Sequence, residues 1–93
     1  MRTIRRTAVF KRDYRPEKKG RFAETLDKDL AGILTELAED RQLAPRHRDY
    51  ALAGQWKDHR DRHVRPDLVL IYCKPDSAHL DLVRLGSHSE LGL

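Results

Sequence analysis

The sequence predicts an α+β domain in which an N-terminal strand and two helices pack on one face of a mainly antiparallel, twisted sheet. Residues 23–41 carry apolar residues at helical spacing, which predicts an amphipathic helix. Residues 68–73, LVLIYC, are apolar throughout, and residues 79–85, HLDLVRL, alternate apolar with polar positions. Because the helical pattern precedes these strands, we expect the helices to cover one sheet face and to leave the other face free.

The N-terminal half should form one short strand and two helices. Residues 2–7 favour a strand, and residues 8–19 favour a helix that Pro16 should kink or shorten. Residues 19–21 contain a glycine and indicate a turn. The helix over residues 23–41 has acidic residues on the face opposite its apolar positions. Those apolar positions are Leu26, Leu30, Ile33, Leu34, Leu37 and Ala38.

The C-terminal half should form most of the sheet. Residues 42–55 predict a long connection with at most a short strand around Leu52. The apolar run LVLIYC fits a central strand that is buried on both faces. A turn at residues 75–77 then predicts a hairpin with residues 79–85, in which Leu80, Leu82 and Arg84 share one side and Leu85 lies on the other. The tail, GSHSELGL, is too short for a helix of independent stability, so it should pack back on the sheet or fray.

Size and composition favour a single domain over residues 1–93 with one hydrophobic core. With 39% hydrophobic and 37% charged residues, the chain fits neither a disordered protein nor a membrane protein, and no apolar run could span a bilayer. The N-terminus lacks the pattern of a secretory signal, which favours a cytoplasmic location. Cys73 is the one cysteine, so no internal disulfide can form, and its apolar neighbours predict a buried, inert thiol.

The distribution of charge indicates an anionic partner. The formal net charge is +4, and 13 of the 19 basic residues are arginine, whose planar fork suits phosphate. Residues 2–21 hold nine basic residues against two acidic ones, whereas residues 22–40 hold one against six. RNA or DNA is therefore favoured over a membrane surface, for which a basic amphipathic helix would be expected.

Three residues could supply acid-base chemistry for RNA cleavage without a metal ion. Attack of a ribose 2'-hydroxyl on its neighbouring phosphate needs a base, a cation for the developing charge and an acid for the leaving oxygen. His63 can act as base or acid because an imidazole titrates near pH ~6.5, and Asp67 could orient it or share the base role. His88, after the last strand, could donate the proton. Equally, these histidines could be solvated, and Asp67 could be a simple turn residue.

Cationic and aromatic residues could hold the RNA. Arg84, Arg60 and Lys57 are candidates for binding phosphate, although Arg84 could also be a solvated strand residue. Trp56 and Tyr50 are further candidates for contacts with RNA. Trp56 is, however, more often an anchor in a core or on a sheet than a platform for a base.

A metal site is the competing chemical hypothesis. His59, Asp61 and His63 alternate along a predicted strand, and Asp67 follows closely. The chain has no second cysteine or further histidine motif at typical zinc spacing, so only half of a ligand shell can be named. We therefore expect neither a metal nor another cofactor.

Two segments, LAGQWKDHRDRHVRPDLVLIY and RLGSHSEL, stand in the C-terminal half of the chain. Together they resemble the C-terminal half of the YafQ-type toxins of the RelE/ParE superfamily; the resemblance covers residues 50–92 by motif and residues 1–49 more loosely. It implies a RelE-like fold and the toxin of a type II toxin-antitoxin system. Such a toxin is an endoribonuclease that cleaves messenger RNA in the ribosomal decoding site and arrests growth. The resemblance also implies a cognate antitoxin, expected to wrap the toxin with an acidic or partly disordered segment.

The family motifs assign roles to four positions. The central histidine of the RDxHxxPD pattern falls on His63, its carboxylate on Asp67, the late histidine of GxH on His88 and the arginine before it on Arg84. The resemblance implies that these groups share acid-base and phosphate-stabilising work. His88 would be the general acid, with Asp67 or His63 as the base.

Two positions depart from the family pattern. A histidine often stands where this chain has Tyr50, and a phenol is no base at neutral pH. An aromatic residue often stands where this chain has Gly92. The departures leave two hypotheses: either His47, His59 or Asp61 acts as an auxiliary group, or the chain is a weak or inactive homologue that works by binding its antitoxin or RNA.

Overall fold

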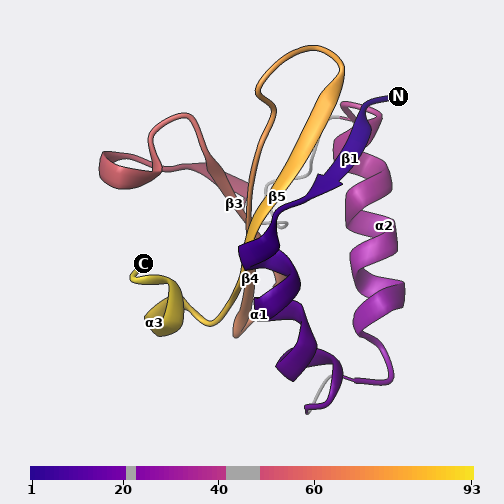
Figure 1. Ribbon diagram of the computed structural model, residues 1–93, viewed down its shortest axis with the longest axis vertical. Helices are drawn as coiled ribbons and strands as arrows, with labels where there is room; N and C mark the ends of the chain where they lie inside the picture. The colour runs from indigo at the N-terminus through magenta and orange to yellow at the C-terminus, as the bar shows by residue number, and fades with distance from the viewer. Residues whose placement is uncertain (21–22, 42–48) are drawn as a thin grey trace.

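The computed structural model describes residues 1–20, 23–41 and 49–93. Its sheet has five strands in the order β1-β5-β4-β3-β2, in which β1 runs parallel to β5 and all other neighbours are antiparallel (Figure 1). The strands are β1 Thr3–Arg6, β2 Asp49–Ala51, β3 Arg60–Arg65, β4 Leu68–Cys73 and β5 His79–Gly86. The helices are α1 Ala8–Lys18, α2 Leu26–Ala38 and the single turn α3 His88–Leu91, with a 3-10 turn, η2, at Gly54–Trp56. The predicted α+β class with a mainly antiparallel sheet is confirmed.

The main core lies between one face of the sheet and the two long helices. The periodic positions of α2 are buried, and they meet Phe10 of α1 and alternate residues of the central strand. Burial of this stripe stabilises α2 more than local propensity does. The strand residues in this core are Leu68, Leu70, Tyr72, Leu80, Leu82 and Leu85.

The two helices differ from their predicted bounds. The side chain of Thr7 caps α1 by accepting a hydrogen bond from the amide of Phe10 (3.1 Å), and α1 continues through Pro16 to Lys18. Pro16 was expected to kink or shorten this helix, but the helix continues two residues past it, and the backbone hydrogen bond that Pro16 cannot donate is lost in the last turn. α2 is shorter than the predicted residues 23–41 at both ends. None of the described helices is long and apolar enough to cross a membrane.

A β-bulge in β5 changes the direction of Arg84. The register pairs Tyr72 with Leu82 and Ile71 with Arg84, so Val83 is an extra residue between them. Leu82 and Leu85 therefore both face the main core, although three positions separate them. Simple alternation placed Arg84 on the side of the core leucines; this prediction is wrong, because the bulge moves Arg84 to the opposite face.

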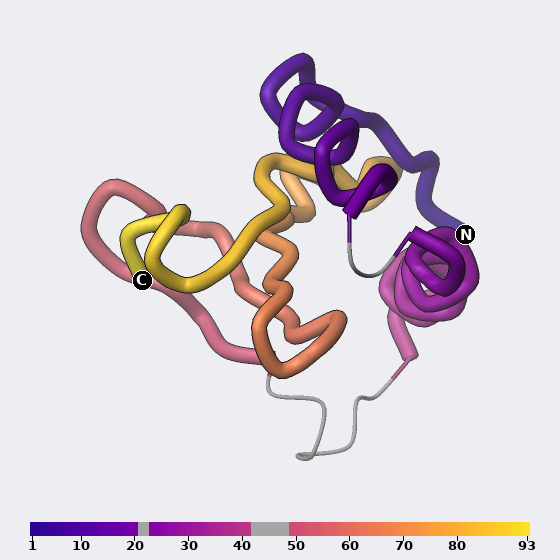
Figure 2. The backbone as a smooth tube through the Cα atoms, turned by 90° about the horizontal axis from the view of Figure 1, so that it is seen from below, coloured from indigo at the N-terminus to yellow at the C-terminus, as the bar shows by residue number. Residues whose placement is uncertain are grey.

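That opposite face, here called the outer face, carries a second apolar cluster. Val69 and Ile71 of β4 are buried by Leu91 of α3, and Leu52, Trp56 and Val83 pack against them. Figures 1 and 2 show α3 and the η2 segment on the side of the sheet away from α2. The tail packs back on the sheet as predicted, but the expectation of a free second face is wrong because the tail and η2 cover its centre.

Candidate active site

Register brings two histidine-bearing segments together on the outer face. Val69 lies directly opposite His63 of β3 and Gly86 of β5, and opposed residues on neighbouring strands point to the same face. His88 follows Gly86 by two residues. The ring centroids of His63 and His88 are 4.9 Å apart, with the planes inclined by 44°. At this separation the two rings are in direct contact, so both imidazoles can face the same bound group from one side.

The start of α3 fixes the position of His88. Ser87 is the N-cap: its hydroxyl accepts a hydrogen bond from the amide of Glu90 (3.2 Å), while the Glu90 carboxylate accepts one from the amide of Ser87 (2.9 Å). Gly92 ends the turn in the left-handed conformation (φ 72°), which glycine adopts without strain. The family departure at Gly92 thus has a local structural role.

A second row crosses the outer face beside the histidines. Tyr50 of β2 is paired with Asp61 of β3, Asp61 with Ile71, and Ile71 with Arg84 of β5. Tyr50 is 56% exposed on the edge strand, whereas Asp61 is only 6% exposed. Burial keeps Asp61 away from solvent, so it is not placed to contact a substrate directly.

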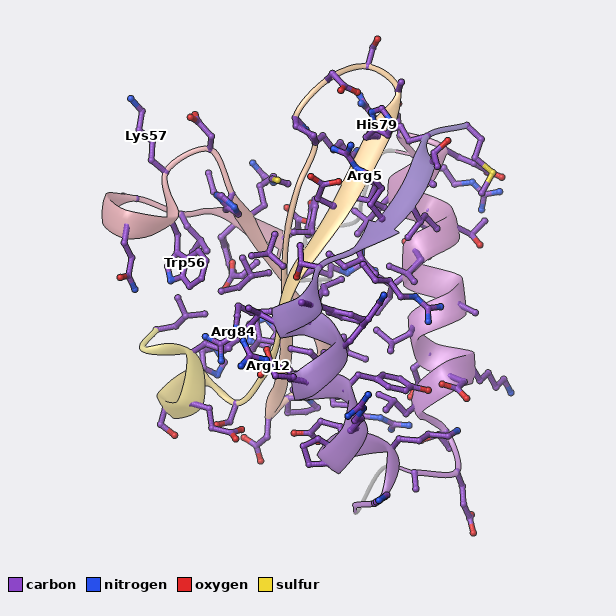
Figure 3. The ribbon with its side chains drawn as sticks, viewed as in Figure 1. Arg5, Arg12, Trp56, Lys57, His79 and Arg84 are labelled. Carbon is purple, nitrogen blue, oxygen red and sulfur yellow. The ribbon has the colours of Figure 1, made fainter. Side chains whose placement is uncertain are left out.

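Arg84 is held by a residue that the sequence did not indicate. The carboxylate of Asp13, on α1, accepts hydrogen bonds from Nε (2.7 Å) and Nη2 (3.3 Å) of Arg84, and this interaction raises the pKa of the guanidinium. Figure 3 shows Arg84 between α1 and α3. Asp13 is one of only two acidic residues in the basic segment 2–21, and that rarity was the one available signal.

The η2 segment carries residues that were predicted to contact RNA. Trp56 is half-buried in the second apolar cluster and meets the ring of His59 edge-on at 5.6 Å. Its Nε1 is buried and has no hydrogen-bond acceptor among the described residues; one carboxylate oxygen of Asp61 likewise lacks a donor there. Lys57 is exposed and points away from α3 (Figure 3). Only Lys57 of this group is fully available to a ligand.

Arg60 is not brought to this site. It is paired with Tyr72, which faces the main core, so Arg60 lies on the helix-covered side of the sheet. There it forms an ion pair with Asp49, which also accepts a hydrogen bond from the Tyr72 hydroxyl. Burial and the Asp49 carboxylate raise the pKa of Tyr72. The structure therefore places Arg60, a candidate for binding phosphate, on the face opposite His63, because residues alternate between faces along a strand.

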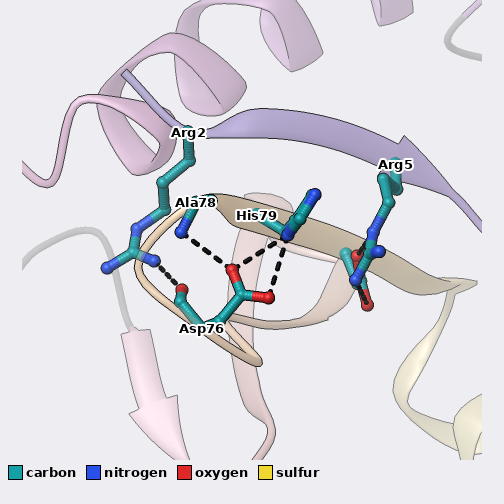
Figure 4. A network of polar contacts seen from close by, with 6 residues as sticks. Arg2, Arg5, Asp76, Ala78 and His79 are labelled. Atoms are coloured by element: carbon teal, nitrogen blue, oxygen red, sulfur yellow. Dashed lines mark hydrogen bonds and ion pairs between the residues drawn. The ribbon is translucent and has the colours of Figure 1, made fainter.

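The remaining candidates lie around or away from the pair of histidines. Asp67 is exposed in the two-residue turn between β3 and β4, two residues before Val69. His47 lies outside the described residues. His79 lies at the start of β5, where its Nδ1 contacts the carboxylate of Asp76 at 2.9 Å (Figure 4). That contact lowers the pKa of Asp76. His79 lies at the start of β5, whereas His88 follows the end of that strand.

The geometry gives no support to the metal hypothesis. In the described parts of the chain, no group of three or more His, Cys, Asp or Glu side chains is arranged to hold a metal ion. Of the four residues considered, His59 contacts Trp56 and Asp61 is buried. The outer face instead presents two imidazoles and a guanidinium.

The sequence of this chain matches a known protein family. The family described as "Bacterial toxin of type II toxin-antitoxin system, YafQ" matches residues 2–92. The mRNA interferase toxin YafQ of Escherichia coli K12 is 44% identical over 45 residues, which are 48% of each chain. The chain thus spans about half the length of the curated relatives that it matches.

Solved structures match along nearly the whole chain. The metal-bound toxin from Helicobacter pylori has a TM-score of 0.82 and 39% identity, with 98% of this chain and 99% of that chain covered. YafQ in the E. coli DinJ-YafQ toxin-antitoxin complex has a TM-score of 0.80 and 31% identity, with 97% and 96% covered. Family profile and fold agree: the chain belongs to the YafQ family of bacterial toxins of type II toxin-antitoxin systems.

Proposed function

We propose that this single domain, residues 1–93, is a metal-independent endoribonuclease that cleaves messenger RNA on the ribosome. The observation that carries the proposal is the 4.9 Å separation of His63 and His88, with Arg84 on the same sheet face. The name of the E. coli relative, mRNA interferase toxin, supports the choice of substrate. Surface arginines support binding to a polyanion.

The proposed reaction is an internal transfer of the phosphate. A base, His63 or Asp67, removes the proton of the ribose 2'-hydroxyl, and the resulting oxygen attacks the adjacent phosphorus. The bond from phosphorus to the 5'-oxygen breaks, and His88 donates a proton to that leaving oxygen. Arg84 stabilises the charge on the phosphorane. The products are a 2',3'-cyclic phosphate and a 5'-hydroxyl end. Because the 2'-oxygen is the nucleophile, the step needs no water molecule as a reactant.

Tyr50 favours a second candidate function. Its exposed hydroxyl can donate a hydrogen bond to phosphate but cannot serve as a base near neutral pH. A chain that lacks a base here could be a catalytically weak homologue that acts by binding antitoxin or RNA. Cleavage by the wild-type chain decides between the two functions.

Mapping of cleavage ends on purified ribosomes tests the proposal. Ribosomes programmed with a defined message are incubated with wild type, His63→Ala, His88→Ala or the control His79→Ala, which removes an imidazole at the other end of β5. We expect wild type and the control to cleave alike and each site variant to lose about 10²- to 10⁴-fold in rate. Equal rates for wild type and His88→Ala would refute the mechanism. A folded wild type that binds ribosomes without cleaving would favour the binding function.

We also propose that an acidic antitoxin segment binds between α1 and α2; the E. coli DinJ-YafQ complexes support an antitoxin as the partner. A groove of about 330 Å³ runs there; Phe10 and Leu34 are among its mainly apolar lining residues. A second hollow adjoins it and is lined in part by Arg6, Lys11 and Arg15. These three cations form no ion pair within the described parts of the chain, so they can attract acidic side chains.

A further inference from the structure

Asp13 joins α1 to the strand that leads into the candidate site. One oxygen of its carboxylate accepts hydrogen bonds from Nε of Arg84 (2.7 Å) and from the amide of Leu85 (3.0 Å). The other oxygen accepts one from Nη2 of Arg84 (3.3 Å). The side chain of Asp13 is 17% exposed and that of Arg84 28% exposed, so both partners are largely shielded from water. The contact links Arg84 and Leu85, the two residues that follow the β5 bulge, to a helix 71 and 72 positions earlier in the chain.

The local architecture explains why a side chain binds there. β1 pairs with β5 only over His79–Leu82, so the rest of β5 has no neighbouring strand at this edge. The side chain of Thr7 donates a hydrogen bond to the carbonyl of Val83 (3.2 Å), and Asp13 accepts from the amide of Leu85. Helix α1 thus satisfies backbone groups that a strand would otherwise satisfy, at the point where the bulge turns Arg84 outward.

The way in which Asp13 contacts Arg84 leaves the guanidinium able to bind an anion. A guanidinium has five N–H donors, and Asp13 occupies one on Nε and one on Nη2. The two donors of Nη1 and the second donor of Nη2 remain. These form the end of the fork that binds two oxygens of a phosphate in parallel. A neighbouring carboxylate also fixes the plane of the guanidinium, which a lone arginine would not maintain.

We propose that Asp13 is a positioning residue for RNA cleavage. It fixes the guanidinium of Arg84 so that its remaining donors meet a phosphate bound beside the adjacent rings of His63 and His88. It also fixes the β5 bulge, from which the chain continues through Gly86 to His88. The proposal rests on the proposed function, because it assigns Arg84 to the phosphate.

The test combines Asp13→Asn with Arg84→Ala. In asparagine, an NH₂ group replaces the oxygen that accepts the hydrogen bond from Nη2 of Arg84. Since two donors cannot bond to each other, one hydrogen bond is lost with little change in volume. We expect Asp13→Asn to lower kcat by about tenfold or more with a small change in KM, because misplacing a transition-state contact affects rate more than binding. In the Arg84→Ala background the same substitution should change kcat less than twofold. Loss of the slowly exchanging Nε proton signal of Arg84 in NMR spectra should accompany the loss of rate.

Asp81→Asn is the matched control. Asp81 holds Arg5 through Nε (2.6 Å) and Nη2 (3.0 Å) on the same strand, away from the histidines. The Asp81→Asn variant should lose a similar ion pair without losing activity. If Arg84→Ala abolishes cleavage while Asp13→Asn stays within twofold of wild type, the positioning role is refuted and the proposed function stands. Equal loss from Asp13→Asn in both backgrounds would also refute it, and a wild type that does not cleave would overturn both proposals.

Discussion

Truncation of Leu91 should release the helix that carries His88. Leu91 is 3% exposed and packs on Val69 and Ile71, so it is the apolar contact that holds α3 on the sheet. Burial of a leucine side chain contributes about 1.5–3 kcal/mol. A single helical turn has no independent stability, so most of this contribution goes into docking α3. Leu91→Ala should therefore lower the ratio of docked to undocked α3 by roughly 10- to 100-fold, since about 1.4 kcal/mol corresponds to tenfold.

Hydrogen exchange measures this ratio without reference to activity. The amide of Gly92 donates to the carbonyl of Ser89 (3.3 Å) only while α3 is formed, so its protection should fall by the same factor in Leu91→Ala. The control is Leu93→Ala, which removes the same atoms from a residue that is 41% exposed and should leave protection and cleavage unchanged. The cleavage rate of Leu91→Ala should fall by no more than the factor by which the ratio of docked to undocked α3 falls. Unchanged protection of Gly92 in Leu91→Ala would refute this account of α3.

Three further predictions follow from charge and burial. Hydrogen bonds from Lys74 and Arg2 lower the pKa of the Asp40 carboxyl to about 2, so these contacts stabilise the fold above pH ~4 and are lost as pH falls toward about 2. The difference in Tm between wild type and Asp40→Asn should shrink over that interval, and a constant difference would contradict the assignment. Burial raises the pKa of the Cys73 thiol, so iodoacetamide at pH 8 should alkylate it more slowly than free cysteine; equal rates would show an accessible thiolate. Combined Lys11→Glu and Arg15→Glu should weaken antitoxin binding by about tenfold or more in calorimetry, and unchanged affinity would place the antitoxin elsewhere.

The elements that local pattern determines were predictable from the sequence. The apolar run at residues 68–73 is the central strand, with its residues buried on both faces. The stripe of α2 faces the core, although the helix ends before the predicted bounds. Spacing of apolar residues predicts these features because each depends on which side of one element is buried.

The arrangement of the candidate site depends on features that act at long range. The bulge in β5 was detectable only through the spacing of Leu82 and Leu85, which fits neither a regular strand nor a helix on its own. Contact between Asp13 and Arg84 joins residues 71 positions apart, and no local pattern encodes it. Arg60 was assigned to the site by its charge, but its strand position turns it to the other face. Residue type was thus informative about chemistry, whereas the sheet register decided which groups meet.

The same distinction applies to His88. Its place after a glycine and a serine identified it as a candidate acid, but α3 is too short to hold an imidazole in place by itself. Its orientation depends on the capping box of Ser87, the left-handed conformation of Gly92 and the buried side chain of Leu91. An aromatic residue in place of Gly92 would gain a surface for stacking but would strain the end of this turn, because side chains disfavour a φ of 72°. The departure from the family pattern therefore gives up a stacking surface at this position and keeps the unstrained turn that fixes His88.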